Sequence, residues 1–173
     1  ALLMVCSQNL TSFFLSLELL SVPTYGLLAY THERSKSLES GLKYLVLSAT
    51  ASAAMLMGMA SLYAFSGSMQ FQDIGMAVIS GLGNPLMMLG MALVLFALAF
   101  KLSLFPFHSW TADVYQGAPA PIATFLATVS KIAVLALAIR FIFLSGSLAM
   151  DSMHTILTVI AVLSIVIGNL LAV

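Results

Sequence analysis

The sequence predicts an all-α protein: a polytopic transmembrane helix bundle that contains one proline-broken helix. Three observations lead to this fold class. Hydrophobic residues make up 61% of the chain and charged residues only 7%, whereas soluble domains carry about 25% charged residues. The apolar residues come in runs of about 20 or more, the length that a helix needs to cross a bilayer. One run is too long for a single plain span and has Pro106 inside it.

Each apolar run corresponds to one expected helix within a single transmembrane domain, residues 1–173. Residues 1–7 are interpreted as the end of a helix, residues 66–84 as a loop, and the spans as 9–30, 41–65, 85–115, 119–144 and 152–173. Strands of a barrel would be short and would alternate apolar with polar residues, so continuous runs favour helices. Because the chain starts without methionine and stops within an apolar run, we expect an internal piece of a longer protein.

Composition excludes several classes of function. The formal net charge is +0, so no overall field attracts nucleic acid. A single cysteine, Cys6, can form neither an internal disulfide nor a metal site. The sequence contains no glycine-rich phosphate loop, no cluster of metal ligands and no nucleophile–base pair. The lipid bilayer is therefore the expected surroundings, and the chemistry must come from the few charged residues.

Three charged residues stand near the middle of predicted spans, where a charge is costly and faces protein or water rather than lipid. They are Glu18, Lys101 and Lys131. Burial in apolar surroundings disfavours the charged form of a lysine, and a nearby carboxylate restores it. A carboxylate that moves would then switch a lysine between holding and releasing a proton, so the pattern indicates proton transfer.

A helix break, a lysine and a histidine occupy one neighbourhood in the span 85–115. Pro106 follows Lys101 by five residues and cannot donate a backbone hydrogen bond. The carbonyls freed near residue 102 need other partners, and irregular backbone at this depth is tolerated only against protein or a wet cavity. Histidine is a common proton carrier in proteins, and His108 is suited to bridging two lysines.

Simpler interpretations exist for each of these residues. Glu18 could be a structural hydrogen-bond partner, Lys101 could satisfy the carbonyls freed by Pro106, and Lys131 could extend to the membrane surface. His108 could be a packing residue. Trp110 is predicted to be an anchor at the membrane interface, and the small residues at 48, 49, 52 and 53 are predicted to allow close helix packing.

Several motifs resemble one known family. The runs KLSLFPFH (101–108), WTADVYQGAP (110–119), TVSK (128–131) and FLSLE (14–18) are similar to the subunit N family of the proton-pumping NADH–quinone oxidoreductase, respiratory complex I. The run from Asp113 to Pro119 favours subunit N over the sister antiporter-like subunits L and M. One departure is Ala112, where many members have proline.

The resemblance implies a fold, residue roles and partners. It implies two inverted repeats of five helices, of which this chain holds the first and the start of the second. It makes Glu18 the carboxylate paired with the pumping lysine Lys101, His108 the histidine near the break, and Lys131 the connecting lysine. The chain would be a translocase subunit without a redox centre or cofactor of its own. Flavin, iron–sulfur clusters and quinone are expected in or between other subunits.

The resemblance also implies where the chain works. It would contact other membrane subunits of the complex, including the sister antiporter-like subunits, and would couple quinone reduction elsewhere to proton transfer. The expected location is the bacterial inner membrane, with an organelle inner membrane or the thylakoid as alternatives. Two other functions remain open: a subunit of a cation/proton antiporter, and a scaffold whose polar residues only hold helices together.

Overall fold

The computed structural model describes residues 1–30, 35–81, 83–145 and 151–171, and its regular structure there is helical apart from one isolated bridge. Among these described residues, five helices are long and apolar enough to cross a membrane, so the predicted fold class is confirmed and the chain is a multi-pass membrane protein. Residues 31–34, 82, 146–150 and 172–173, which include parts of predicted connections, lie outside the described residues. The helices are α1 (Leu2–Val5), α2 (Leu10–Leu28), α3 (Ser35–Ser66), α4 (Phe71–Ser80), α5 (Pro85–Leu102), α6 (Ser109–Gly117), α7 (Ala120–Phe125), a π-helical segment (Leu126–Ser130), α8 (Lys131–Leu144) and α9 (Asp151–Leu171).

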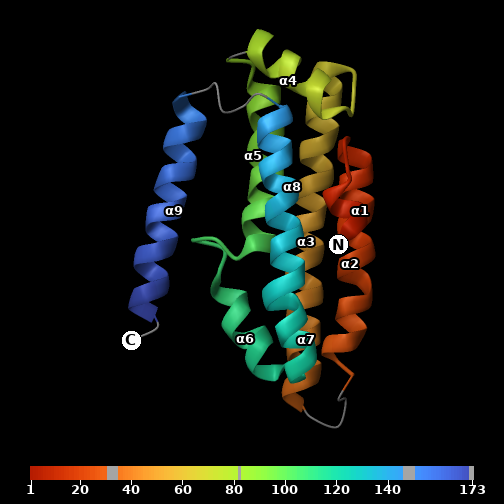
Figure 1. The fold of residues 1–173 in the computed structure, drawn as a ribbon, viewed down its shortest axis with the longest axis vertical. Coiled ribbons are helices and arrows are strands. Elements are labelled where there is room, and N and C mark those ends of the chain that lie inside the picture. Colours follow the sequence, from red (N-terminus) through yellow and green to blue (C-terminus); the bar gives the residue numbers. More distant parts are fainter. Residues whose placement is uncertain (31–34, 82, 146–150, 172–173) are drawn as a thin grey trace.

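The long helices stand side by side, and the break between α5 and α6 lies about half-way along the bundle (Figure 1). Helix α3 packs against α2, α5 and α6. Helix α9 stands to one side, and its half-buried positions recur at residues 157, 160, 164 and 167. This spacing is that of a helix that turns one face to its neighbours.

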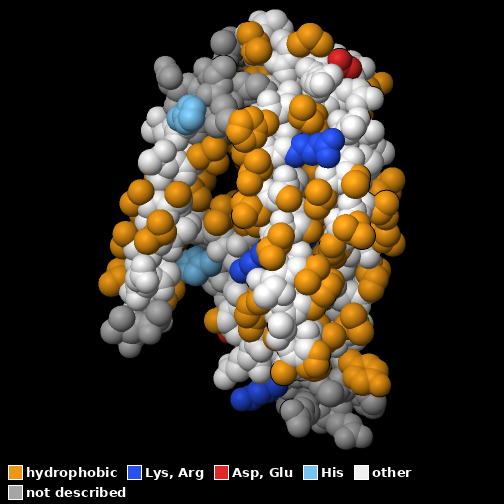
Figure 2. Space-filling view, viewed as in Figure 1, with side chains coloured by type: hydrophobic (Ala, Val, Ile, Leu, Met, Phe, Trp, Pro, Cys, Tyr) orange, Lys and Arg blue, Asp and Glu red, His pale blue; other side chains and the backbone are white. Residues whose placement is uncertain are grey.

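Apolar side chains cover the outer surface of the bundle, as Figure 2 shows for one face. Leu19, Leu42 and Ile132 are each more than 60% exposed. In a water-soluble protein such large apolar patches would favour association. In a bilayer they contact acyl chains, so the exposed surface agrees with the five spans.

Two predicted boundaries are wrong, and both errors concern helical residues assigned to loops. Helix α3 starts at Ser35 rather than at residue 41. The buried Ser37 hydroxyl donates to the Leu28 carbonyl at 2.7 Å and so ties this first turn to α2, and the exposed pair Glu39 and Lys43, one turn apart, adds a little. The predicted loop 66–84 contains the ten-residue helix α4. Its buried residues, Phe71, Ile74, Gly75 and Val78, follow helical spacing, a signal that the glycines and polar residues nearby concealed.

Helix ends are held by local hydrogen bonds that the sequence makes available. The Asn9 side chain accepts from the Ser12 amide at 2.7 Å, and the Asn84 side chain accepts from the Leu86 amide at 2.9 Å. Asparagine is a preferred residue at this position because its oxygen satisfies an otherwise unpaired helix amide. Arg140 donates to the Val5 carbonyl at 2.8 Å and so ties α8 to the end of α1.

Two glycines allow α3 and α5 to approach closely. A Cβ atom added to Gly58 would lie 2.9 Å from the Gly90 carbonyl oxygen and 3.0 Å from the Val94 amide nitrogen. Both are backbone atoms, so the helices would have to move apart. Small residues at such crossings are a general device of membrane bundles.

We expect Gly58→Ala to destabilise the intact protein by about 1–3 kcal/mol, the usual cost of overpacking a close contact. The measurement is the thermal unfolding midpoint of the purified protein in detergent. Gly26→Ala is the matched control, because no side chain or neighbouring helix lies within 4 Å of the Cβ position at Gly26. Equal midpoints for the two variants would contradict the close α3–α5 contact.

Candidate functional site

A lysine amine is buried at the centre of the bundle, where α2, α3 and α5 meet. Lys101 is only 8% exposed. Its Nζ donates to Ser21 Oγ at 2.7 Å and to Ser48 Oγ at 2.6 Å. The Tyr44 ring lies 5.7 Å from the same nitrogen. The amine therefore has neutral hydrogen-bond acceptors and an aromatic face around it, which offset part of the cost of burying a charge.

A carboxylate contacts the same face of α3 as the Lys101 amine does. Glu18, half-buried on α2, accepts a hydrogen bond from the Ser52 hydroxyl. Ser48 and Ser52 are one helical turn apart, and Tyr25 on α2 donates to Ser48 at 3.0 Å. Among the described residues, ion pairs within 4.0 Å join only Lys43 with Glu39 and Asp113. Glu18 and Lys101 thus belong to one polar cluster without touching directly.

The helix is interrupted immediately after this lysine. Helix α5 ends at Leu102, and Ser103 adopts a left-handed conformation with φ of 58°. The Leu104 amide bonds to the Ala99 carbonyl at 2.9 Å, as in a Schellman-type helix end. The Phe105–Pro106 peptide bond is cis, and α6 resumes at Ser109.

The carbonyls freed by the break find partners other than the lysine. The Phe100 carbonyl accepts from the Ser103 amide at 3.0 Å and from Trp110 Nε1 at 3.3 Å. Lys101 bonds to serine hydroxyls instead, so the simpler interpretation of this lysine as a carbonyl partner is wrong. The prediction of Trp110 as an interface anchor is also wrong, because this residue is 6% exposed and packs on Phe100 with ring centroids 5.3 Å apart.

His108 lies at the far end of the break, just before α6. Its Nδ1 atom is buried and has no hydrogen-bond partner among the described residues. It borders a pocket of about 90 Å³ that is also lined by Ser103 and by Ser164 of α9. The Ser164 hydroxyl oxygen accepts from the Phe105 amide at 3.0 Å, so α9 supports the irregular backbone. A small pocket that has serine hydroxyls in its lining, beside a residue with an unpaired nitrogen, is a setting in which proteins hold ordered water.

Lys131 is half-buried and sits apart from Lys101. Its Nζ lies 5.8 Å from the Tyr115 ring and makes no hydrogen bond to a described side chain. Aromatic rings connect the surroundings of the two lysines: Tyr44 to Trp110 at 5.3 Å, and Trp110 to Tyr115 at 6.5 Å. The two lysines are therefore connected by a cluster of aromatic rings rather than by a direct contact.

A π-helical segment, Leu126–Ser130, ends immediately before Lys131. Such wide turns are rare and occur frequently at functional sites. The two threonines that the sequence places in line with Lys131 each donate to their own helix, Thr124 to the Ala120 carbonyl and Thr128 to the Thr124 carbonyl. Both are exposed, and in the part of the chain described neither donates a hydrogen bond toward Lys131.

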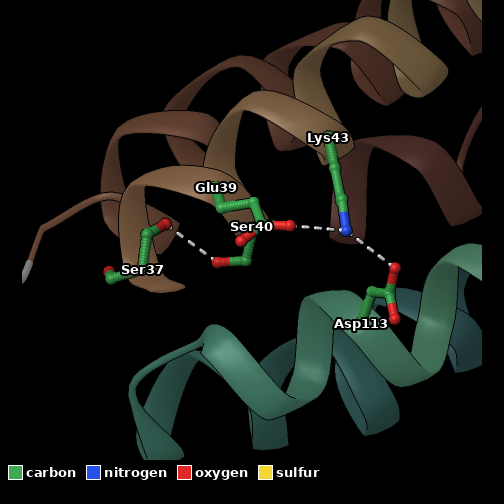
Figure 3. A network of polar contacts seen from close by, with 5 residues as sticks. All are labelled: Ser37, Glu39, Ser40, Lys43 and Asp113. Atoms are coloured by element: carbon green, nitrogen blue, oxygen red, sulfur yellow. Dashed lines mark hydrogen bonds and ion pairs between the residues drawn. The ribbon is translucent and has the colours of Figure 1, made fainter. Parts of the chain in front are cut away.

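A second cluster of polar residues connects α3 with α6 near one end of the bundle. Lys43 lies between Glu39 at 2.7 Å and Asp113 at 2.9 Å, as Figure 3 shows. These side chains are 43–61% exposed, so the ion pairs are weak contributors to stability. Closer contact comes from Gly117, where an added Cβ would lie 2.5 Å from the Lys36 carbonyl oxygen. Together these contacts hold the second half of the broken helix against α3.

Sequence reasoning missed the serines as members of this polar cluster. Ser48 and Ser52 were predicted to be packing residues, yet their hydroxyls contact Lys101 and Glu18. The available signal was two hydroxyls one turn apart in an apolar span that faces a helix with a central carboxylate. That signal was ambiguous, because serine is also a common small residue at helix contacts.

The fold and the site define a class: a multi-pass membrane protein with a buried lysine beside a broken helix and a carboxylate in the same polar cluster. Residues 7–173 match the family described as NADH:quinone oxidoreductase/Mrp antiporter, TM. The chain belongs to this family.

Similar proteins are known by sequence. Over 173 residues the chain is 60% identical to NADH-quinone oxidoreductase subunit N of Acinetobacter baumannii and 60% identical to that of Psychrobacter arcticus. All of this chain is covered in both comparisons, but only 35% of each relative. The chain therefore spans about a third of the length of the curated relatives it matches.

Solved structures share the fold. A chain of respiratory complex I from Thermus thermophilus is 37% identical with a TM-score of 0.79, over 98% of this chain and 36% of that one. A chain of an archaeal membrane-bound sulfane sulfur reductase is 28% identical with a TM-score of 0.71, over 84% and 31%. A chain of the Mrp complex from Dietzia, 24% identical over 75% and 25% with a TM-score of 0.60, shares the fold alone.

We expect Trp110→Phe to destabilise the intact protein by about 0.5–1.5 kcal/mol, because it removes the donor to the Phe100 carbonyl but keeps an aromatic ring. The measurement is the thermal unfolding midpoint in detergent. Phe143→Leu serves as the control, since Phe143 is 69% exposed and lies away from the break. An unchanged midpoint for Trp110→Phe would show that the Trp110 hydrogen bond does not support the helix end.

Proposed function

We propose that this chain is part of subunit N, a proton-translocating membrane subunit of an NADH–quinone oxidoreductase. The supporting observations are its family membership and its 60% identity to two proteins of that name. The proposed complex oxidises NADH and reduces quinone with cofactors held in or between other subunits. This chain would contribute proton transfer, and the neighbouring membrane subunits would be its partners.

The buried amine of Lys101 is the single observation that carries the proposal. A lysine this deep in an apolar bundle is costly and is a functional hypothesis by default. Proton transfer needs a group whose charge its surroundings can change. Lys101 meets this requirement, because it is surrounded by neutral acceptors and lies in the same polar cluster as Glu18.

The proposed route uses four residues in turn. A change in Glu18 alters the hold on the Lys101 proton, and the proton passes by the His108 region toward Lys131. Three features support this order: the helix break between Lys101 and His108, the small pocket at His108 with its two serines, and the aromatic cluster that reaches Lys131. Ordered water would complete the route where the side chains do not touch.

Lys101→Met in the intact protein is expected to lower NADH-driven proton pumping at least about tenfold, because positioned proton-transfer groups contribute on the order of 100-fold or more. The measurement follows NADH oxidation and acidification together in inverted membrane vesicles. Lys36→Met is the control: it removes an exposed lysine at the start of α3 and should leave pumping unchanged. Normal pumping by Lys101→Met would favour the scaffold function.

The same vesicles distinguish a cation/proton antiporter, the alternative that the family description itself includes. An antiporter exchanges ions without a redox partner. If NADH produced no acidification while a sodium gradient moved protons through the wild-type protein, the oxidoreductase assignment would fail. The expected result is acidification with NADH and none with the sodium gradient alone.

A further inference from the structure

Two serines of α3 stand out from the other hydroxyl residues of that helix. Thr50 and Ser61 each donate to the carbonyl four residues earlier, at 2.9 Å, the common way in which a helix satisfies a hydroxyl. Ser52 instead donates to Glu18 on α2. Ser48 is fully buried and accepts from Lys101 on α5. Both hydroxyls therefore contact ionisable groups on other helices.

Hydroxyl groups suit a lysine that changes its charge. An ammonium group only donates hydrogen bonds, whereas a neutral amine also accepts them, and a hydroxyl can do either. A carboxylate in the same place would favour the charged form strongly. Contacts to hydroxyls can therefore hold the Lys101 side chain in one position before and after it loses a proton.

The two serines that contact Lys101 are not equivalent. Ser21 gives its own hydrogen to the Leu17 carbonyl at 2.9 Å, so toward the lysine it is an acceptor. Ser48 shares its oxygen with Lys101 and with Tyr25 at 3.0 Å, and its hydroxyl makes no bond to a carbonyl of its own helix. Ser48 can thus change from acceptor to donor without breaking a helix contact.

We propose that Ser48 and Ser52 are positioning residues for proton transfer: Ser48 holds the Lys101 amine in both protonation states, and Ser52 holds the Glu18 carboxylate. Because both serines belong to one helix, one turn apart, α3 fixes the separation between the acid and the base. The carboxylate then acts on the lysine through space rather than by direct contact. This inference rests on the function proposed above.

The test uses pairs of variants that have the same shape and differ by one hydroxyl. Threonine and valine form such a pair, so Ser48→Thr and Ser48→Val are made in the intact protein, with the same pair at Ser52. Ser61 provides the matched control, since it is 4% exposed on the same helix and bonds only to its own helix. NADH-driven acidification is measured in inverted vesicles, with the amount of assembled complex determined for each variant.

We expect Ser48→Val to pump at least about fivefold less than Ser48→Thr, the effect of losing one hydrogen bond to a charged group. Ser52→Val should likewise pump less than Ser52→Thr, and the two Ser61 variants should match each other. Equal pumping within the pairs at Ser48 and Ser52 would overturn the proposal and leave packing as their role. If neither larger side chain assembles at Ser48, Ser48→Ala is compared with Ser61→Ala, and equal pumping again overturns it.

The same vesicles separate failure of this inference from failure of the proposed function. Normal pumping by Lys101→Met removes the proposed function and this inference with it. Loss of pumping in Lys101→Met together with normal pumping in Ser48→Val removes only the role of the serine.

Discussion

The burial of one amine sets the requirements that much of this bundle meets. An ionisable amine in an apolar interior needs hydrogen-bond acceptors, and lipid acyl chains supply none. The acceptors come from two helices at once, Ser21 of α2 and Ser48 of α3. Those helices must approach α5 closely, and the glycine contact between α3 and α5 permits it. The polar centre and the close packing around it are thus parts of one arrangement.

The second requirement is that the backbone amides and carbonyls at the helix break find hydrogen-bond partners within the protein. Helix α5 ends in a hydrogen-bonded turn. The Trp110 indole donates a hydrogen bond to the Phe100 carbonyl, and the Ser164 hydroxyl of α9 accepts one from the Phe105 amide. Among the described residues, two buried side-chain atoms lack a hydrogen-bond partner, His108 Nδ1 and the Tyr115 hydroxyl, and the His108 side chain borders a pocket. The break is therefore well supported in its backbone and left open at the group suited to proton exchange.

The sequence alone predicted the fold class and the residues around which the site is built. Run length and the absence of charge are strong signals, because the bilayer imposes them on every spanning helix. Glu18, Lys101 and Pro106 stood out because each is costly in that setting. The short helix α4 was not found, since ten residues with glycines and polar neighbours carry little periodic signal. The roles of Ser48 and Trp110 depend on which neighbours face them, which sequence periodicity on one helix cannot determine.

The π-helical segment before Lys131 has a consequence for experiments that map helix faces. A π-turn takes one more residue per turn than an α-turn, so residues after Ser130 are rotated relative to a continuous α-helix by about 100°, one residue's share of a turn. Cysteine labelling along residues 120–144 would therefore show two periodic patterns that are out of phase at this segment. A face assigned from residues 120–125 cannot be extended to α8 by counting in steps of 3.6.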